Sequence, residues 1–488
     1  MDGAEPILTS LPHDDSRRFL YSYLGKRMRG RGERIYYADD NRSRPTLVGG
    51  VTGSGKTELL IALAVQDSAK GRPVVYIDGK CEMKTLQKLY YYTHHVLKRR
   101  FYVLTPTTLL DGYTHSWNPL ISSQLESRTI TESIFNAFRD PQVKQDSGVA
   151  FYTEFQRTVF SHLMMALRFS KYAVCMQDLL YALEYDDLLS KLPSFLKPEG
   201  MVPYAELLKM RNEEGRNFGQ NLKSFLNYLR LFDHWSLNSY NPVIRFDAMM
   251  LSDSVIYVGL PVNAQKYLMS CIGNIIINQL KALSQYVQSH YKHKRHFINC
   301  TVDEAGSFVD TGLPDWLCKS RTSGFSLTLG VHMLADLEGR RPGFAKQVQG
   351  NTPNIYMFRN NDKETAEWFS DLGCHELGEA RAANIKAAGS DLEETGAGST
   401  RASEQRRVPP DSIKSLRTGQ CYFLSSALNR PMLLAACYLP EPPDRPERQY
   451  VRSFDTRPPE MSGLNLSYFI TSERIRMSNN GKNEAVLS

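Results

Sequence analysis

A glycine-rich turn between an apolar run and a helical pattern constrains this chain more than any other feature. The stretch is LVGGVTGSGKTELLIALA, residues 47–64, and it has the spacing of a phosphate-binding loop. The residues of the loop are Gly50, Val51, Thr52, Gly53, Ser54, Gly55, Lys56 and Thr57. Glycines let backbone N–H groups turn toward a phosphate, and the following helix presents its positive N-terminal end to the same anion. The pattern therefore predicts a nucleotide site on a strand–loop–helix unit.

Lys56 and Thr57 complete the loop with a charge and a hydroxyl group. In such loops the lysine ammonium reaches the β- and γ-phosphates of the nucleotide, and the threonine hydroxyl ligates Mg²⁺. The alternative interpretation is a glycine-rich turn that binds nothing, but it does not account for the strand before the turn and the helix after it. We therefore expect a nucleotide to bind here with its magnesium ion.

An acidic pair at the end of another apolar run supplies the second half of the predicted site. The run HFINCTVDEAGSFVD, residues 296–310, carries Asp303 and Glu304 at the carboxyl end of a strand of the buried type. Asp303 is expected to hold Mg²⁺ through water, and Glu304 to orient the attacking water or accept its proton. The alternative is an ordinary surface Asp-Glu pair at a strand end. Beside the phosphate loop, the acidic pair predicts hydrolysis of ATP rather than storage.

Seven short apolar runs predict the strands of one sheet. They are continuous rather than alternating, which is typical of a parallel sheet covered on both faces. The runs are residues 46–50, 73–78, 101–104, 255–260, 297–304, 326–331 and 354–358. The sequence therefore predicts an α/β nucleotide-binding core.

The remaining patterns divide the chain into five parts. Apolar residues at three- and four-residue steps, as in YTEFQRTVFSHLMMALRF, predict helices between the third and fourth strands. The five parts are a basic N-terminal arm (1–45), the first part of the nucleotide-binding domain (46–119), an all-helical insertion domain (120–245), the second part of the nucleotide-binding domain (246–438) and a proline-rich C-terminal tail (439–488). Within the fourth part, the small and polar residues 385–408 predict a mobile loop.

The two ends of the chain leave alternatives open. The Arg-rich stretch RRFLYSYLGKRMRGRGER, residues 17–34, predicts a solvated arm, with contact to a membrane surface or to nucleic acid as the alternative. The tail keeps apolar islands such as LNLSYFI, residues 464–470, which favours a docking segment that becomes ordered on a partner. The alternative for the tail is packing on this chain's own core.

Composition narrows the class of protein. The net charge of +7 permits an anionic partner without demanding one. The eight cysteines show no CxxC pair and no metal-ligand spacing, so we expect reduced core residues of an intracellular protein. No apolar run reaches the roughly 18 to 20 residues of a membrane span, and the N-terminus lacks the apolar region of a secretory signal.

The ordered set of motifs resembles the type IV coupling proteins, the ring ATPases of conjugation and type IV secretion systems. The resemblance covers residues 40–435 and rests on the segments GGVTGSGKTELL, VVYIDGKCEM, SVIYVGLPVNAQK, TVDEAGSF, RTSGFSLTLGVHMLADL and NTPNIYMFRNNDKETAEWFSDLG. It implies a RecA-like P-loop NTPase core with a mostly parallel sheet and an inserted all-α domain. It also implies ATP and Mg²⁺ as cofactors, with the loop and the acidic pair in the roles given above.

The resemblance assigns roles to further residues. Asp78 and Lys80 match an Asp-x-Lys segment near the nucleotide, with a polar strand end as the alternative. Arg321, in KSRTSG, matches an arginine finger offered to the neighbouring subunit, with a structural ion pair to Asp315 as the alternative. Arg359, in YMFRNN, is expected to approach the nucleotide across an interface, with a surface ion pair as the alternative.

Two departures from the family pattern stand out. His332 occupies the position where the family usually has a glutamine that senses the γ-phosphate. An imidazole can still donate one hydrogen bond, and a satisfied core histidine is the alternative. The family also usually carries N-terminal membrane helices, which this sequence does not show. A soluble variant held at the membrane by partners and a shortened chain are both open explanations.

The function implied by the resemblance is that of a motor. It is a homo-hexameric ATPase at the cytoplasmic face of the inner membrane that feeds DNA, protein or a DNA–protein conjugate to a type IV secretion channel, with adaptor proteins as further partners. A second interpretation is an ATP-gated receptor platform that recruits protein substrates with little pumping. A third is a soluble DNA translocase or packaging motor, which the long helical insertion disfavours.

Overall fold

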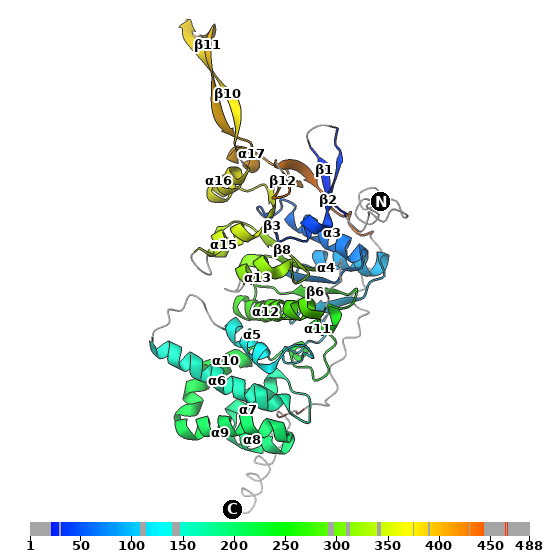
Figure 1. Cartoon of the computed structure of the whole chain (residues 1–488), viewed down its shortest axis with the longest axis vertical. Coiled ribbons are helices and arrows are strands. Elements are labelled where there is room, and N and C mark those ends of the chain that lie inside the picture. The colour runs from blue at the N-terminus through cyan, green and yellow to red at the C-terminus, as the bar shows by residue number, and fades with distance from the viewer. Residues whose placement is uncertain are drawn as a thin grey trace, which may run out of the picture.

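The computed structural model shows an elongated molecule with a sheet-based part above a helical part (Figure 1). The structure describes residues 21–28, 31–107, 114–138, 147–290, 297–308, 313–338, 343–373, 375–388, 391–428, 430–443, 464 and 466. Every structural statement below refers to these residues.

The seven predicted strands are all present and lie side by side in parallel. In sheet order they are β9 (Asn354–Phe358), β3 (Thr46–Gly49), β8 (Phe325–Val331), β7 (Ile298–Asp303), β4 (Val74–Asp78), β6 (Val255–Gly259) and β5 (Phe101–Leu104). Each neighbouring pair in this series is parallel. The predicted α/β core with a mostly parallel sheet is therefore confirmed.

Helices cover both faces of this sheet, as the continuous apolar runs predict. Successive residues of β4 point to opposite sides: Val74 and Tyr76 belong to one buried cluster, Val75 and Ile77 to the other. One face packs against α3 (Lys56–Ala69) and α4 (Met83–Tyr90), and the other against α12 (Lys266–His290), α13 (Leu313–Ser320) and α15 (Phe344–Asn351). A strand buried on both faces has no polar side, so its sequence does not alternate.

Beyond β9 the sheet continues with four antiparallel strands that the sequence analysis did not identify. They are β12 (Gln420–Ser425), β13 (Met432–Ala436), β1 (Tyr21–Arg27) and β2 (Arg34–Ala38). The solvated arm predicted for residues 1–45 is therefore wrong for its second half, because β1 pairs with both β13 and β2. Residues 1–20 lie outside the described part of the chain.

Charged residues of the predicted arm are buried in a network of ion pairs, which is why the sequence alone suggests a solvated segment. The short helix α2 (Asp39–Arg42) follows β2 and is almost fully buried at both ends. Arg42 and Arg72 both bind the carboxylate of Asp67, at 2.9 and 2.8 Å. Arg72 and Lys70 in turn bind Asp39, at 2.7 and 2.8 Å. Buried charges are tolerated when they are paired and hydrogen-bonded, so these residues belong to the core.

The segment between β5 and β6 forms the helical part of the molecule, drawn at the bottom of Figure 1. Its described α-helices are α5 (Ser127–Phe138), α6 (Ser147–Arg168), α7 (Met176–Glu184), α8 (Asp186–Lys191), α9 (Met201–Glu214), α10 (Asn217–Arg230) and α11 (Phe246–Met249). The first and last segments of this part lie next to each other, because Ile244 donates its N–H to the carbonyl of Ser116 at 2.9 Å. The predicted all-α insertion is confirmed, and we call residues 114–249 the helical domain.

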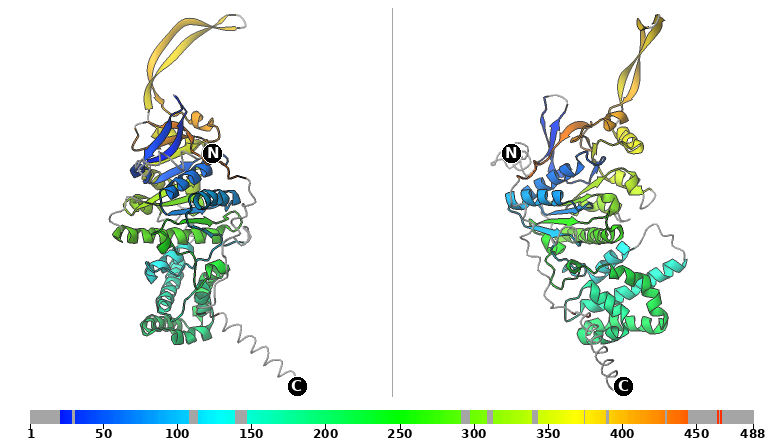
Figure 2. Two further views of the ribbon diagram at one scale, coloured as in Figure 1. Left: turned by 90° about the vertical axis from the view of Figure 1, so that its right-hand side faces the viewer. Right: turned by 180° about the vertical axis from the view of Figure 1, so that it is seen from behind.

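A two-stranded ribbon rises from the opposite end of the molecule (Figures 1 and 2). It consists of β10 (His375–Ala388) and β11 (Asp391–Arg406), paired antiparallel. The mobile loop predicted for 385–408 is therefore wrong, because most of those residues are in paired strands. β10 and β11 form a sheet of their own, in which the pairing is made by backbone groups. Their sequences therefore lack the alternation of apolar and polar residues that would predict strands.

The described part of the C-terminal tail packs on this chain. Leu439 is fully buried beside the sheet, and Leu464 and Leu466 are buried in the helical domain. The tail predicted to order on a partner is thus bound in cis at these residues, which is the alternative interpretation. Among the described helices none is long and apolar enough to cross a membrane.

The predicted reduced cysteines are free thiols at all seven described positions. Six of them are buried, whereas Cys318 is exposed, so the expected core position is wrong for that residue. Cys374 lies outside the described residues.

The elements that complete the sheet-based part are short. They are the π-helix η2 (Tyr91–Val96), the 3₁₀ helix η6 (Ala305–Ser307), α14 (Ala335–Glu338), α16 (Lys363–Leu372) and α17 (Pro410–Lys414).

Candidate nucleotide-binding site

The predicted phosphate loop joins β3 to α3 as expected. Gly50, Gly53 and Gly55 all have positive φ, at 154°, 74° and 112°. Gly55 is the residue before α3, and its left-handed backbone, which side chains rarely adopt, turns the chain into the helix. Lys56 and Thr57 are the first two residues of α3, so the loop lies at the N-terminal end of a 14-residue helix. This is the geometry in which helix N–H groups face an anion.

Neighbouring segments hold the loop in place from outside. Val51 donates its N–H to the carbonyl of Arg359 after β9, at 2.9 Å, and Gly50 donates to Val331 of β8, at 3.3 Å. Gly419, just before β12, donates to the carbonyl of Ser54 at 2.8 Å. Thr52 and Gly53 stay exposed between these supports. The loop is therefore fixed at both sides while its tip is accessible, and Gly419 is a support that no sequence motif indicated.

The side chain of Lys56 is buried within the loop. Its Nζ donates to the carbonyl of Gly50 and lies 3.0 Å from Nδ1 of His332. Burial lowers the pKa of Lys56, and the nearby Asp303 and Glu304 oppose that effect. The ammonium group is thus held where the backbone of the loop converges, next to two carboxylates.

Thr57 and Asp303 meet as the motif predicts. The Thr57 hydroxyl donates to Oδ2 of Asp303 at 2.8 Å, across the gap between α3 and the end of β7. Asp303 is fully buried, and burial raises the pKa of its carboxyl group, partly offset by the Thr57 hydrogen bond. A hydroxyl and a carboxylate are hard oxygen ligands of the kind that Mg²⁺ prefers. These two side chains fit a magnesium ion.

Glu304 adopts a backbone conformation that is rare for its residue type. Its φ is 60° and its ψ is 43°, in the left-handed region, at the point where β7 ends. Non-glycine residues held in this way cost free energy and cluster at functional sites. Gly79 allows the arrangement, because a Cβ on it would lie 2.7 Å from the Cβ of Glu304.

The carboxylate of Glu304 lies at ion-pair distance from two side chains in the segments that follow β4 and β8. Its Oε1 lies 2.9 Å from Nζ of Lys80 and 2.8 Å from Nε2 of His332. Burial alone would raise the pKa of Glu304, but the hydrogen bonds from His332 and Lys80 lower it to about 2. Glu304 is therefore ionised throughout the neutral range.

His332 joins the two halves of the predicted site. A neutral imidazole protonated on Nε2 satisfies both of its contacts, since Nδ1 then accepts from Lys56 while Nε2 donates to Glu304. Its backbone is fixed as well: its N–H donates to Asp336, and its carbonyl accepts from Asn360 at 2.8 Å. The structure thus places His332 in the site rather than in the apolar core.

Asp78 and Lys80 occupy the next strand end but have different surroundings. Asp78 accepts hydrogen bonds from the backbone N–H groups of Lys80 and Glu82, at 2.9 and 3.1 Å, and from the hydroxyl of Tyr257 at 2.8 Å. Burial, with Asp303 nearby, raises the pKa of Asp78 to about 6. Asp78 therefore organises the turn after β4, and Lys80 is the member of the pair that reaches Glu304.

The two predicted arginines lie in different places. Arg359 has its backbone against the phosphate loop of the same chain, and its Nε is buried without a hydrogen-bond partner among the described atoms. Arg321 is exposed in the turn between α13 and β8. The side chain of Asp315, its predicted alternative partner, lies outside the described side chains. No ion pair of Arg321 occurs among the described residues.

Comparison with known proteins finds similarity both in sequence and in fold. The family model of the type IV secretion-system coupling protein DNA-binding domain matches residues 34–432. The type 4 coupling protein DotL of Legionella pneumophila is 36% identical over 59 residues, which are 12% of this chain and only 8% of DotL.

Solved structures of the coupling protein TrwB resemble most of this fold. The unbound TrwBdeltaN70 structure superposes with a TM-score of 0.55 at 15% identity, covering 87% of this chain and 95% of that one. The plasmid coupling protein TrwB in complex with ADP and Mg²⁺ gives the same TM-score and identity, and it covers 87% of this chain and 96% of that one.

Proposed function

Because this chain belongs to the type IV secretion-system coupling protein family, as its match over residues 34–432 shows, we propose that it is an ATP-hydrolysing coupling protein. Such a protein recruits or translocates DNA or protein substrates to a secretion channel. The observation that carries the proposal is the convergence of Lys56, Thr57, Asp303 and Glu304 at the carboxyl ends of β3 and β7. A protein that only binds nucleotide has no need of the strained, ionised Glu304.

The residues around the loop fit ATP with Mg²⁺, and each has a distinct task. Lys56 and the loop N–H groups would bind the phosphates, while Thr57 and Asp303 would hold the magnesium ion. The metal supplies charge stabilisation between the phosphates when it is bound. That nucleotide complexes of TrwB exist supports the choice of ligand.

The surroundings of Glu304 favour orientation of water over removal of its proton. A carboxylate with a pKa of about 2 is a weak base, because an efficient general base has a pKa near the working pH. As a hydrogen-bond acceptor held by Lys80 and His332, the same group is well suited to fix the position of a water molecule. Lys80 and His332 thus act as positioning residues for Glu304.

The wider assembly follows from the family. We propose a homo-hexameric ring in which the exposed Arg321 of one subunit reaches the nucleotide of the next. The ring would act at the cytoplasmic face of the inner membrane together with secretion machinery, adaptor proteins and its DNA or protein cargo. The exposure of Arg321 in the turn between α13 and β8 supports its availability for such a contact.

Two substitutions test the catalytic assignment. Lys56→Ala should weaken nucleotide binding, because it removes the ammonium from the loop. Glu304→Gln should retain binding of a fluorescent ATP analogue and slow hydrolysis by about two or three orders of magnitude, as expected for loss of a water-positioning group. Glu367→Gln on α16 is the matched control and should leave both unchanged. A Glu304→Gln protein that hydrolyses ATP at the unmodified rate would overturn the proposal.

A further inference from the structure

The segment Leu416–Gly419, which lies between α17 and β12, touches the exposed tip of the phosphate loop. The N–H of Gly419 donates to the carbonyl of Ser54 at 2.8 Å, and the hydroxyl of Thr418 donates to the carbonyl of Gly53 at 3.4 Å. The two carbonyls belong to successive peptide groups of the loop, although Thr418 and Gly53 are 365 positions apart in the sequence. We call residues 416–419 the loop-facing turn.

The backbones of the turn and of the loop approach each other closely. A Cβ placed on Gly55 would lie 3.2 Å from both the N and the Cα atoms of Gly419. The φ angles of Gly55 and Gly419 are 112° and 78°, in the region that residues with a side chain rarely adopt. Glycine at both positions therefore allows direct contact between two backbone segments, with no side chain in between.

The loop-facing turn is held from within and from behind. The N–H of Gln420 donates to the carbonyl of Arg417, and the N–H of Arg417 donates to Oε1 of Gln420, both at 3.0 Å. The carbonyl of Gly419 accepts the N–H of Ala436, the last residue of β13, at 2.9 Å. The antiparallel part of the sheet thus fixes the turn against the loop.

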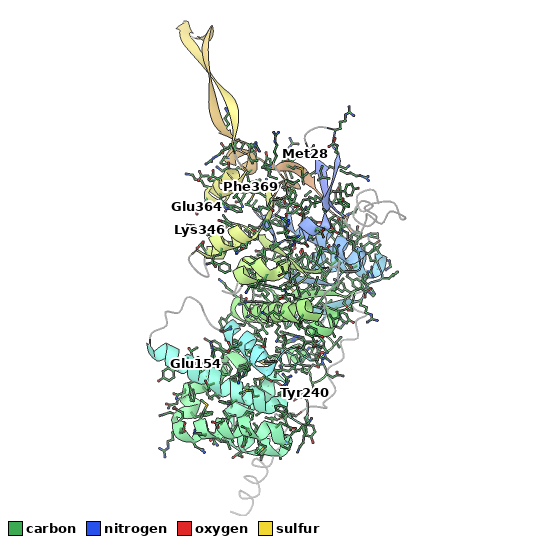
Figure 3. All side chains as sticks on the ribbon, in the orientation of Figure 1. Met28, Glu154, Tyr240, Lys346, Glu364 and Phe369 are labelled. Atoms are coloured by element: carbon green, nitrogen blue, oxygen red, sulfur yellow. The ribbon has the colours of Figure 1, made fainter. Side chains whose placement is uncertain are left out.

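The start of the turn is anchored in the apolar core. Leu416 is buried and belongs to the same apolar cluster as Ile413 of α17 and Phe369 of α16. Phe369, labelled in Figure 3, lies in the upper part of the molecule. A turn that is fixed at its start, across its middle and from behind can hold the exposed tip of the loop in one position.

The hydrogen bond from Gly419 fixes the direction of one N–H group of the loop. A peptide group is planar and trans, so its C=O and its N–H point in opposite directions. The carbonyl of Ser54 shares a peptide group with the N–H of Gly55. Because that carbonyl points to Gly419, the N–H of Gly55 points away from the turn. N–H groups that face the inside of such a loop bind phosphate oxygens.

We propose that Gly419 is a positioning residue for the phosphate loop, and that the loop-facing turn sets the affinity of the site for the β-phosphate of the nucleotide. Thr418 supports the neighbouring peptide group in the same way. This inference rests on the proposed function, because it concerns the same nucleotide site. Since ADP and ATP both carry the β-phosphate, loss of the turn's hydrogen bonds should weaken the binding of both and leave the catalytic step nearly unchanged.

The test compares Gly419→Ala with Gly343→Ala. Gly343 is the matched control: its φ is 79°, a Cβ on either glycine would meet no atom within 4 Å, and its N–H also donates a hydrogen bond, to Glu338. Both substitutions should lower the urea midpoint, because alanine is strained at this φ. Only Gly419→Ala should weaken the binding of a fluorescent ADP with Mg²⁺, by roughly tenfold, as expected for one lost hydrogen bond to a charged group. Its KM for ATP should rise in proportion, with kcat unchanged within about twofold.

Equal ADP affinities of the two folded variants, or a loss in Gly419→Ala that affects kcat alone, would overturn the inference. If Gly419→Ala does not fold, Thr418→Val decides the matter, because it removes the hydroxyl group at nearly constant shape. Thr418→Val should weaken ADP binding by roughly threefold, and Thr418→Ser, which keeps the hydroxyl group, should restore it. Equal affinities of these two variants would refute the inference.

ATP hydrolysis by the unaltered protein separates this inference from the proposed function. If that protein binds ADP and the variants differ as expected but no ATP is hydrolysed, the proposed function is wrong and the role of the turn stands. If it hydrolyses ATP while the Gly419→Ala and Gly343→Ala proteins bind ADP equally, the role of the turn is wrong and the proposed function stands.

Discussion

Asp78 offers a sharp test of the electrostatics at the end of β4, through the substitution Asp78→Asn. The carboxyl group is 2% exposed and accepts three hydrogen bonds, yet burial, with Asp303 nearby, raises its pKa from 3.8 to about 6. The folded protein therefore keeps the proton of Asp78 over a pH range in which the unfolded chain has already released it. Asparagine is a neutral group of nearly the same shape, so it resembles the protonated acid.

The sign and the size of the effect follow from the two pKa values. Between pH 3.8 and about 6 the folded state binds more protons than the unfolded state, so stability falls as the pH rises through this window. A change in pKa from 3.8 to about 6 corresponds to about 3 kcal/mol. The unaltered protein should therefore lose about 3 kcal/mol from this one group between pH 3.5 and pH 7, and Asp78→Asn should not.

The assay compares urea unfolding of the two proteins from pH 3.5 to pH 7 in metal-free buffers, so that no metal ion neutralises Asp303. The NH₂ group of asparagine cannot accept a hydrogen bond. Because it would face the N–H of Glu82, the Asp78→Asn protein should be less stable at every pH. That loss does not depend on pH, so the difference between the two proteins across the window isolates the charge. Asp411→Asn, an exposed control whose side chain is 94% accessible, should show no such trend. A constant difference between Asp78→Asn and the unaltered protein at all pH values would refute the reasoning.

Three further predictions concern the core, the ring and the cargo. Asp67→Ala should cost about 3–5 kcal/mol of unfolding free energy in urea, because it leaves Arg42 and Arg72 buried without this carboxylate. A loss below about 1 kcal/mol would show that this buried network of charges does not stabilise the fold. Arg321→Ala and Lys56→Ala, each inactive alone, should regain part of the ATPase activity in mixed rings, whereas rings that form and stay inactive would contradict a shared site. If the cargo is DNA, binding should be independent of sequence, should fall steeply with salt and should raise ATP turnover. Absence of both binding and stimulation at low salt would favour the receptor platform for protein substrates.

The parts of this fold that the sequence predicts are those whose signal is local. Strands buried on both faces appear as short continuous apolar runs, and all seven were identified in this way. The phosphate loop and the acidic pair are equally local, because each is defined by residue spacing within one segment. The strands β1 and β2 escaped prediction for the opposite reason. They lie in a stretch of charged residues that reads as solvated, and β1 is inside the sheet only because it pairs with β13, which is distant in the sequence. Arg42 of the following helix α2 is likewise buried against a distant partner, Asp67.

The contacts inside the site depend on sheet order, which the sequence leaves open. Because β3, β8, β7 and β4 are neighbours and parallel, the segments that follow their carboxyl ends meet at one edge of the sheet. The segment after β8 contributes His332, which therefore reaches both Lys56 after β3 and Glu304 after β7. A motif predicts that each of these residues is near the nucleotide, but it cannot predict that His332 touches both of the others. That double contact gives the histidine a specific meaning, because its imidazole bridges the loop lysine and the carboxylate of Glu304.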